Sequence, residues 1–213
     1  MLAAMTRVRL GTDERRARLL VLGEDLFSRH PYDELTTDVI AAAGSISKGL
    51  LFHYFGSKRG FYIATIEHVA ERLLGHVELD PKRAPFDAVL DALERFLDFV
   101  HDHAAIYRAL LRGGLGADPQ SQAIVDRVRW TTVHRVLSLI EPGRAVPTDG
   151  RPLLTPAGVR LYGWVGCTEA LSVAWIDGGL DRDRIRTLMI ESFAPVLAAW
   201  PRDRQAATMA VAE

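Results

Sequence analysis

The residues between Asp38 and Glu67 combine hydrogen-bond donors with positive charge in a way that suits phosphate binding. No acidic residue occurs between these two positions, whereas Lys48, Lys58 and Arg59 do. Two of the three lysines of the chain therefore lie in this window, although the formal net charge of the whole chain is −1. Lysine, serine and tyrosine side chains donate hydrogen bonds to the phosphate oxygens of nucleic acids. We therefore expect a local nucleic-acid-binding surface, because the net charge gives the molecule as a whole no positive electrostatic field.

A neutral helix face between two acidic segments would give the same charge pattern without any ligand, so a second signal is needed. The positions of helix caps provide one. Thr36 or Thr37 can cap a short helix that ends near residue 43, and Ser47 can cap another that reaches about residue 53. Two short helices joined by a four-residue turn are typical of the helix-turn-helix motif, whose second helix enters the major groove of DNA.

The second short helix begins with Ser47, Lys48 and Gly49, which are small or extended residues. A major groove about 12 Å wide admits one helix, and the base edges lie at its floor. Gly49 costs a helix roughly 1 kcal/mol relative to alanine, but it allows the backbone to approach DNA closely. The alternative is that Gly49 is an ordinary turn residue. Phe52 and Phe55 are expected to anchor this helix on its neighbours, because two short helices bury too little surface alone.

The elements that must position these residues are helices, because helical periodicity extends over nearly the whole chain and strand alternation nowhere persists. We predict an all-α protein with about nine helices. An amino-terminal helix-turn-helix domain over residues 12–80 is expected to precede a helical ligand-binding and dimerisation domain over 81–200, with flexible termini at 1–11 and 201–213. The predicted helices span residues 12–30, 37–43, 47–53, 58–76, 85–103, 104–112, 119–140, 156–177 and 182–199, and Pro201 is expected to end the last one.

The run from Thr36 to Lys58 reads TTDVIAAAGSISKGLLFHYFGSK, and it resembles the DNA-binding signature of the TetR family of transcriptional regulators. The resemblance covers roughly residues 12–75. It includes the threonine start, the Ile-Ala pair, the aromatic-x-Tyr-Phe ending and the Ser-Lys pair that opens the next helix. The family resemblance implies binding to double-stranded operator DNA. The helices that follow are similar to the family only in their layout.

The resemblance also implies roles for single residues. Phosphate contacts are implied for Thr36, Thr37, Tyr54 and Lys58, and base-facing or groove-edge positions for Ser47, Lys48 and His53. Two features depart from the family pattern. Gly44-Ser45 stands where Ala-Gly is usual, which predicts a slightly different turn. Phe52 replaces a frequent tyrosine, which removes one hydroxyl group from the presumed DNA surface.

The two last predicted helices carry more apolar residues than one buried face needs, so both require cover on a second side. We expect them to form a four-helix interface between two identical chains, since two operator half-sites require a two-fold dimer. The alternative is that they only complete the core of a monomer. The residues expected at this interface are Tyr162, Trp164, Trp175, Phe193 and Val196.

A ligand cavity is expected between the carboxy-terminal helices, where pockets are mostly apolar and contain a few polar groups. The candidates to line it are Tyr107, Arg108, Trp130, His134, Trp164, Cys167 and Glu169. Each of them alone is more often ordinary packing, although a carboxylate such as Glu169 is costly to bury unless it is paired. We expect a small, largely apolar effector that relieves repression through the helix over 58–76, with activation as the alternative.

Other classes of function are disfavoured by missing patterns. Cys167 is the only cysteine, and no metal-spaced histidine pair, nucleophile elbow or glycine-rich phosphate loop occurs. We therefore expect no metal, no cofactor and no enzymatic activity, while a helical enzyme or an adaptor without DNA affinity remain the alternatives. No apolar run approaches the roughly 18 residues of a membrane span, and residues 1–10 contain no export signal, so we expect a cytoplasmic protein without a membrane partner.

Overall fold

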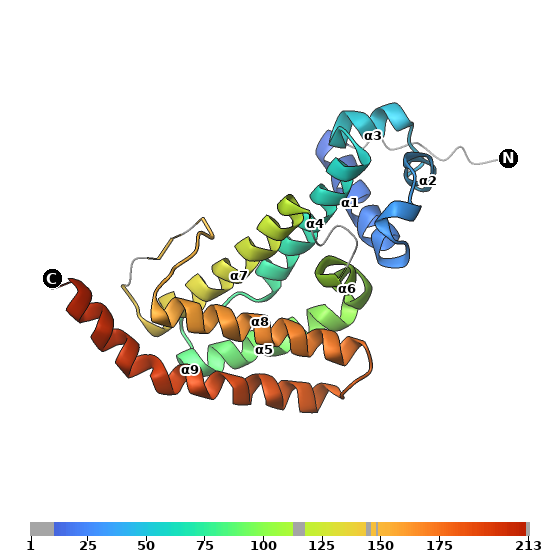
Figure 1. The fold of residues 1–213 in the computed structure, drawn as a ribbon. Helices are drawn as coiled ribbons and strands as arrows, with labels where there is room; N and C mark the ends of the chain where they lie inside the picture. Colours follow the sequence, from blue (N-terminus) through green and yellow to red (C-terminus); the bar gives the residue numbers. More distant parts are fainter. Residues whose placement is uncertain (1–10, 113–117, 144–145, 148, 212–213) are drawn as a thin grey trace.

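The computed structural model describes residues 11–112, 118–143, 146–147 and 149–211, and within these ranges it contains helices and no strand (Figure 1). The all-α prediction is therefore confirmed. No helix in the described part of the chain is long and apolar enough to cross a membrane. The elements are α1 (Thr12–Arg29), a 3-10 helix η1 (Tyr32–Glu34), α2 (Thr37–Ala43), α3 (Lys48–Phe55), α4 (Lys58–His76), α5 (Pro85–Asp102), α6 (Ala104–Arg112), α7 (Pro119–Ile140), α8 (Pro156–Ile176) and α9 (Arg182–Val211).

Side-chain caps determine where the helices of the amino-terminal region begin. The hydroxyl oxygen of Thr36 accepts the backbone N–H of Val39 at 3.3 Å, and Ser47 caps α3 in the same way, at 3.1 Å from the nitrogen of Leu50. Ser57 caps α4 through the N–H of Gly60, at 2.9 Å. Each cap satisfies one of the amide groups that a helix start leaves without an intrahelical partner.

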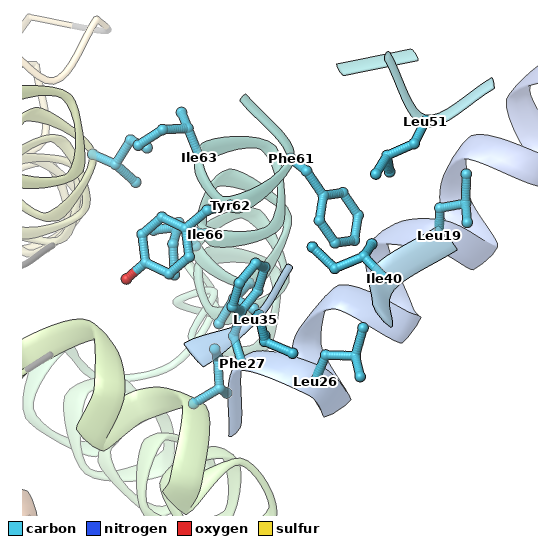
Figure 2. Close-up of a cluster of buried hydrophobic side chains, with 14 of the residues drawn as sticks. Leu19, Leu26, Phe27, Leu35, Ile40, Leu51, Phe61, Tyr62, Ile63 and Ile66 are labelled. Atoms are coloured by element: carbon cyan, nitrogen blue, oxygen red, sulfur yellow. The ribbon is translucent and has the colours of Figure 1, made fainter. Parts of the chain in front are cut away.

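One apolar cluster holds the short helices α2 and α3 in place (Figure 2). Ile40 of α2 and Leu51 of α3 pack with Phe61 of α4, which is fully buried. The Phe27 ring of α1 lies 5.6 Å from that of Phe61 and meets Tyr62 edge to face at 4.9 Å. Because aromatic side chains bury much apolar area, this cluster supplies the burial that two short helices lack.

The same cluster continues across the predicted domain boundary, because it also contains Phe99 of α5, Ile106 of α6 and Ile124 of α7. The α4–α5 connection over residues 77–84 contains Pro81, and Pro85 opens α5. The division into domains at residue 80 therefore stays a prediction. Helix α4 leads from α3 to the side of α7, and thus joins both ends of the molecule (Figure 1).

Helices α8 and α9 run side by side along the carboxy-terminal region (Figure 1). The indole N–H of Trp164 in α8 donates to the backbone carbonyl of Met189 in α9 at 3.1 Å. The predicted end of α9 at Pro201 is wrong, because the helix continues to Val211 and passes through both Pro195 and Pro201. A proline removes one intrahelical hydrogen bond, and the alanine-rich residues that follow favour continuation.

Residues 201–211, part of the tail that was predicted to be flexible, are helical, and their flexibility stays a prediction. Residues 212–213 and 1–10 lie outside the described part of the chain, and Gly11 precedes the first residue of α1.

Candidate nucleic-acid interface and ligand cavity

The amino end of α3 is exposed at the outer end of the molecule, away from α8 and α9 (Figure 1). Ser47, Lys48 and Gly49 are all solvent-exposed, as is His53 one turn further along. The Lys48 ammonium lies 2.7 Å from a carboxylate oxygen of Asp38 in α2, and both side chains are at least half exposed. An exposed ion pair contributes little stability, so Lys48 can exchange this partner for a phosphate at low cost.

Gly49 has no packing role within the subunit. A Cβ atom built at this position would meet only the hydroxyl oxygen of Ser47, at 3.8 Å. Gly49 is also helical, which excludes the ordinary turn residue as an explanation. At Gly60, by contrast, a Cβ would lie 2.0 Å from the carbonyl oxygen of Phe55, so glycine is required there for close packing of α4 against the end of α3.

The turn between α2 and α3 contains the departure noted in the sequence. Ser45 adopts a φ of 50°, a left-handed conformation that non-glycine residues seldom use. Its backbone N–H donates to the carbonyl of Ala42, and that of Ile46 donates to Ala41, both at 3.0 Å. The turn therefore closes α2 with a left-handed residue even though serine stands at this position.

The two phenylalanines of α3 have different environments. Phe55 packs edge to face on Phe61 at 4.9 Å, and the Arg16 guanidinium lies 5.6 Å from its ring centre, so the predicted anchoring role is confirmed. The same prediction is wrong for Phe52, which is 44% exposed. Leu51 and Phe55 are four residues apart and share the buried face, whereas Phe52 is turned about 100° from Leu51. The helical spacing around Leu51 was the signal that could have shown this.

Three of the four implied phosphate ligands are at least partly engaged in the fold. Thr36 caps α2 with its side chain, while Thr37 is half-buried in the first turn of that helix. Tyr54 is half-buried and packs on the apolar cluster, with its ring 6.0 Å from that of Phe55. These positions leave Thr37 and Tyr54 only partly accessible, so their contacts with DNA stay predictions.

Lys58 does not extend freely toward solvent as its implied phosphate role requires. Its ammonium donates to the carbonyl oxygens of Tyr32 at 3.0 Å and Leu35 at 2.9 Å. It also lies 4.1 Å from the centre of the Tyr32 ring, a cation–π distance. Lys58 thus holds the start of α4 against the segment around η1, and its contact with a phosphate stays a prediction.

Arg59, the third cation of the acid-free window, contacts the carboxy-terminal region. Its guanidinium binds Asp118 through two hydrogen bonds of 2.8 and 2.9 Å and the side-chain oxygen of Gln120 at 3.2 Å. Asp118 also caps α7, since it accepts the backbone N–H groups of Gln120 and Ser121. Of the three cations in this window, Lys48 is therefore the one available at the exposed face of α3.

An apolar cavity of about 100 Å³ lies between α4, α5, α6, α7 and α8. Most of its wall is aliphatic or aromatic. Three of the predicted residues line it, namely Tyr107, Trp164 and Glu169. The Tyr107 hydroxyl is buried and makes no hydrogen bond within the described residues, and burial raises the pKa of this tyrosine. The nearby Ser172 hydroxyl lowers the pKa of Tyr107, but by less than burial raises it. The Ser172 hydroxyl itself donates a hydrogen bond to the backbone carbonyl of Thr168 at 2.7 Å.

Glu169 has the ion-pair partner that its position requires. Arg129 donates from Nε to both carboxylate oxygens, at 3.0 and 3.1 Å, and from Nη2 to one of them at 2.7 Å. Arg129 also contacts Asp126 at 3.0 Å. The negative charge of Glu169 is therefore balanced inside the protein.

Arg108, Trp130, His134 and Cys167 do not line this cavity, so their contact with an effector stays a prediction. Arg108 pairs with Asp177 at 2.7 Å. Cys167 is half-exposed on α8.

The α7 helix shows why two of these residues point elsewhere. Trp130 stacks on Tyr162, with ring centres 4.6 Å apart, and His134 is buried, which lowers its pKa. The cavity face of α7 instead carries Val128, Thr132 and Arg135, which follow one another at helical spacing. That spacing was the signal by which Arg135 could have been found.

The residues expected between subunits make contacts within one subunit. Trp164, Phe193 and Val196 are buried in a single chain, and Phe193 is only 2% exposed. The hydroxyl of Tyr162 donates to Asp126 of α7 at 2.9 Å, and Trp175 stacks on His101 of α5 with ring centres 5.9 Å apart. Trp164, Phe193 and Val196 therefore contribute to the core of one subunit. Tyr162 and Trp175 are half-buried, so their place at an interface stays a prediction.

The fold and these two sites define a DNA-binding protein of the helix-turn-helix class with a helical ligand-binding region. Residues 19–65 match the tetR family of bacterial regulatory proteins, and residues 85–196 match the Tetracyclin repressor-like C-terminal domain. The second match alone covers more than half of the chain. The chain therefore belongs to the TetR family of transcriptional regulators.

Two curated relatives and one solved structure illustrate the similarity. The transcriptional activator FasR of Mycolicibacterium smegmatis is 29% identical over 135 residues, which are 62% of this chain and 61% of FasR. The chain thus aligns with less than two thirds of FasR. The transcriptional repressor Rv3405c of Mycobacterium tuberculosis is 26% identical over 88% of this chain and 91% of its own length. A TetR-family regulator from Streptomyces coelicolor has a TM-score of 0.74 and 29% identity, covering 89% of this chain and 83% of its own.

Proposed function

We propose that this TetR-family protein binds operator DNA as a homodimer and releases it when a small, largely apolar effector occupies the cavity. The observation that carries this proposal is the position of α4. Its first residues abut the exposed helix α3, while Val69, Ala70 and Leu73 of the same helix line the cavity. A shift of α4 caused by the effector would therefore change the spacing of the two recognition helices in a dimer.

Repression is the output we propose, because the relative that aligns over 88% of this chain is named a repressor. Activation is the second candidate, because FasR is named an activator. Relatives of both kinds are regulators, and we propose no catalytic role for this chain. Since the partner is operator DNA, the proposed site of action is the cytoplasm.

The dimer is proposed to form through the exposed faces of α8 and α9. Val159, Gly163 and Ala170 of α8 and Ala194 and Leu197 of α9 are small or apolar and solvent-exposed in one subunit. A Cβ atom at Gly163 would meet nothing within 4 Å, so a second copy of α8 has room to approach there. Two recognition helices about 34–36 Å apart would then fit successive turns of the major groove.

Operator binding and its loss on effector binding can be measured together. Fluorescence anisotropy with the DNA upstream of the chain's own gene gives the affinity, and 1-decanol serves as the apolar probe. A coupling of about 1–3 kcal/mol predicts operator affinity lower by roughly 5- to 150-fold when the probe is bound. Binding of decanol in the cavity without any change in operator affinity would contradict the coupling.

Leu197→Arg tests the dimer interface. The variant should be monomeric in sedimentation experiments and should bind the operator weakly. A variant that stays fully dimeric would show that the interface lies elsewhere.

A further inference from the structure

The cavity wall contains one positive charge that the protein does not balance. Arg135 of α7 is half-buried and lines the cavity. Its Nη1 group donates to the backbone carbonyl oxygen of Leu74 near the end of α4. Among the described residues, no carboxylate lies within ion-pair distance of this guanidinium. A guanidinium has five N–H donors, so this contact leaves most of its hydrogen-bonding capacity unused.

The second charged residue of the cavity wall does not compensate for Arg135. Glu169 is bound by Arg129 through two guanidinium nitrogens, and Arg129 also contacts Asp126. The two ionised residues that line the cavity therefore differ. Glu169 is neutralised by a partner outside the wall, whereas Arg135 leaves the wall with an excess of one positive charge.

The rest of the wall sets the other requirement for a ligand. Side chains such as Leu73, Leu93, Phe96 and Val128 make the cavity apolar, so a well-hydrated ion does not fit it. A charge beside such a surface is costly unless a counter-charge accompanies it, and a carboxylate matches the planar guanidinium through two parallel hydrogen bonds.

We infer that the effector is an amphiphilic monoanion, with a carboxylate bound by Arg135 and an apolar body that fills the cavity. The inference rests on the proposed function, in which the effector binds in this cavity. It also adds a route for the signal. A carboxylate at Arg135 binds the guanidinium that now contacts the Leu74 carbonyl, so ligand charge acts directly on the end of α4.

The test compares three probes with the same ten-carbon chain, namely decanoate, 1-decanol and decyltrimethylammonium. Calorimetry with the full chain at pH 8 measures their affinities. We expect decanoate to bind about 10- to 100-fold more tightly than 1-decanol, which is the typical gain from a charge-assisted hydrogen bond. The cationic probe should bind most weakly. Arg135→Gln should remove the advantage of decanoate and leave the affinity for 1-decanol nearly unchanged.

Arg95→Gln is the matched control. Arg95 of α5 also donates to backbone carbonyls at and just after the end of α4, to His76 at 2.9 Å and to Glu78, but it does not line the cavity. This variant should keep the preference for decanoate. A control that loses the preference equally would overturn the assignment to Arg135.

The comparison in the wild-type protein does not depend on the folding of any variant. If 1-decanol binds as tightly as decanoate, the monoanion inference is overturned while the apolar effector of the proposed function stands. If none of the three probes binds, both proposals fail together.

Discussion

The two ends of this protein organise their polar groups in opposite ways. At the amino-terminal end, the side chains of Ser47, Lys48 and His53 point to solvent, while the Ser47 cap and the apolar cluster on the opposite face hold the helix that carries them. In the carboxy-terminal region, Glu169 and Arg135 face a cavity, and their contacts come from distant helices. The first arrangement allows polar residues to change without loss of the fold. The second makes the polar residues part of the packing.

The largest expected effect concerns the cluster that supports the exposed end. Phe61→Ala should destabilise the protein by about 3–5 kcal/mol, because Phe61 is fully buried and packs on Phe27 of α1 and Phe55 of α3. Urea unfolding measures this difference. Phe52→Ala is the control on the exposed surface, and its stability should change by no more than about 0.5 kcal/mol. A similar loss of stability in both variants would refute the contrast between the two aromatic residues.

A pair of lysine variants separates DNA contact from structural support. Lys58→Ala should lower the free energy of unfolding by about 1–2 kcal/mol, because it removes two charged hydrogen bonds to backbone carbonyls. Lys48→Ala should leave stability almost unchanged, yet lower the salt dependence of operator binding by about one unit if it neutralises one phosphate. Urea unfolding of both variants measures the stability change, and operator titrations at several salt concentrations measure the salt dependence. A reduced salt dependence in Lys58→Ala alone would reverse the two roles.

The smallest expected effect has opposite signs for folding and for binding. Gly49→Ala should raise stability by up to about 1 kcal/mol, because alanine favours the helix and its Cβ meets open space. The same methyl group should weaken operator binding if the α3 backbone lies close to the DNA. Thermal unfolding and anisotropy on one protein sample measure the two changes. Unchanged operator affinity would show that close backbone approach does not occur at this position.

The amino-terminal site could be predicted from sequence because its signals are local. Ser47 caps α3 and Gly49 follows two residues later, so a short window contains both the helix start and the exposed end. Nearly all helix bounds followed from caps, glycines and prolines in the same way. The exception is Pro201, where the residues after the proline favoured a longer α9.

The cavity could not be predicted equally well, because it depends on how five helices are rotated against each other. Tyr107, Trp164 and Glu169 were identified by residue type, whereas Trp130 and His134 share a helix with Arg135 but point to other neighbours. The choice between these faces of α7 requires knowledge of what packs on each side. The same reason explains why Phe193 was assigned to an interface although it belongs to the core.

Asp118 serves two helices with one carboxylate. It accepts the amide protons of Gln120 and Ser121 at the start of α7, and it also binds the guanidinium of Arg59 at the start of α4. When the first turn of α4 tilts, Asp118 must either follow Arg59 and uncap α7 or keep its cap and release Arg59. Hydrogen–deuterium exchange at the amides of Gln120 and Ser121 therefore reports the tilt of α4 from a position outside the operator surface. The exchange rates of these two amides therefore measure how far the two ends of the protein move together, without a probe attached to the protein.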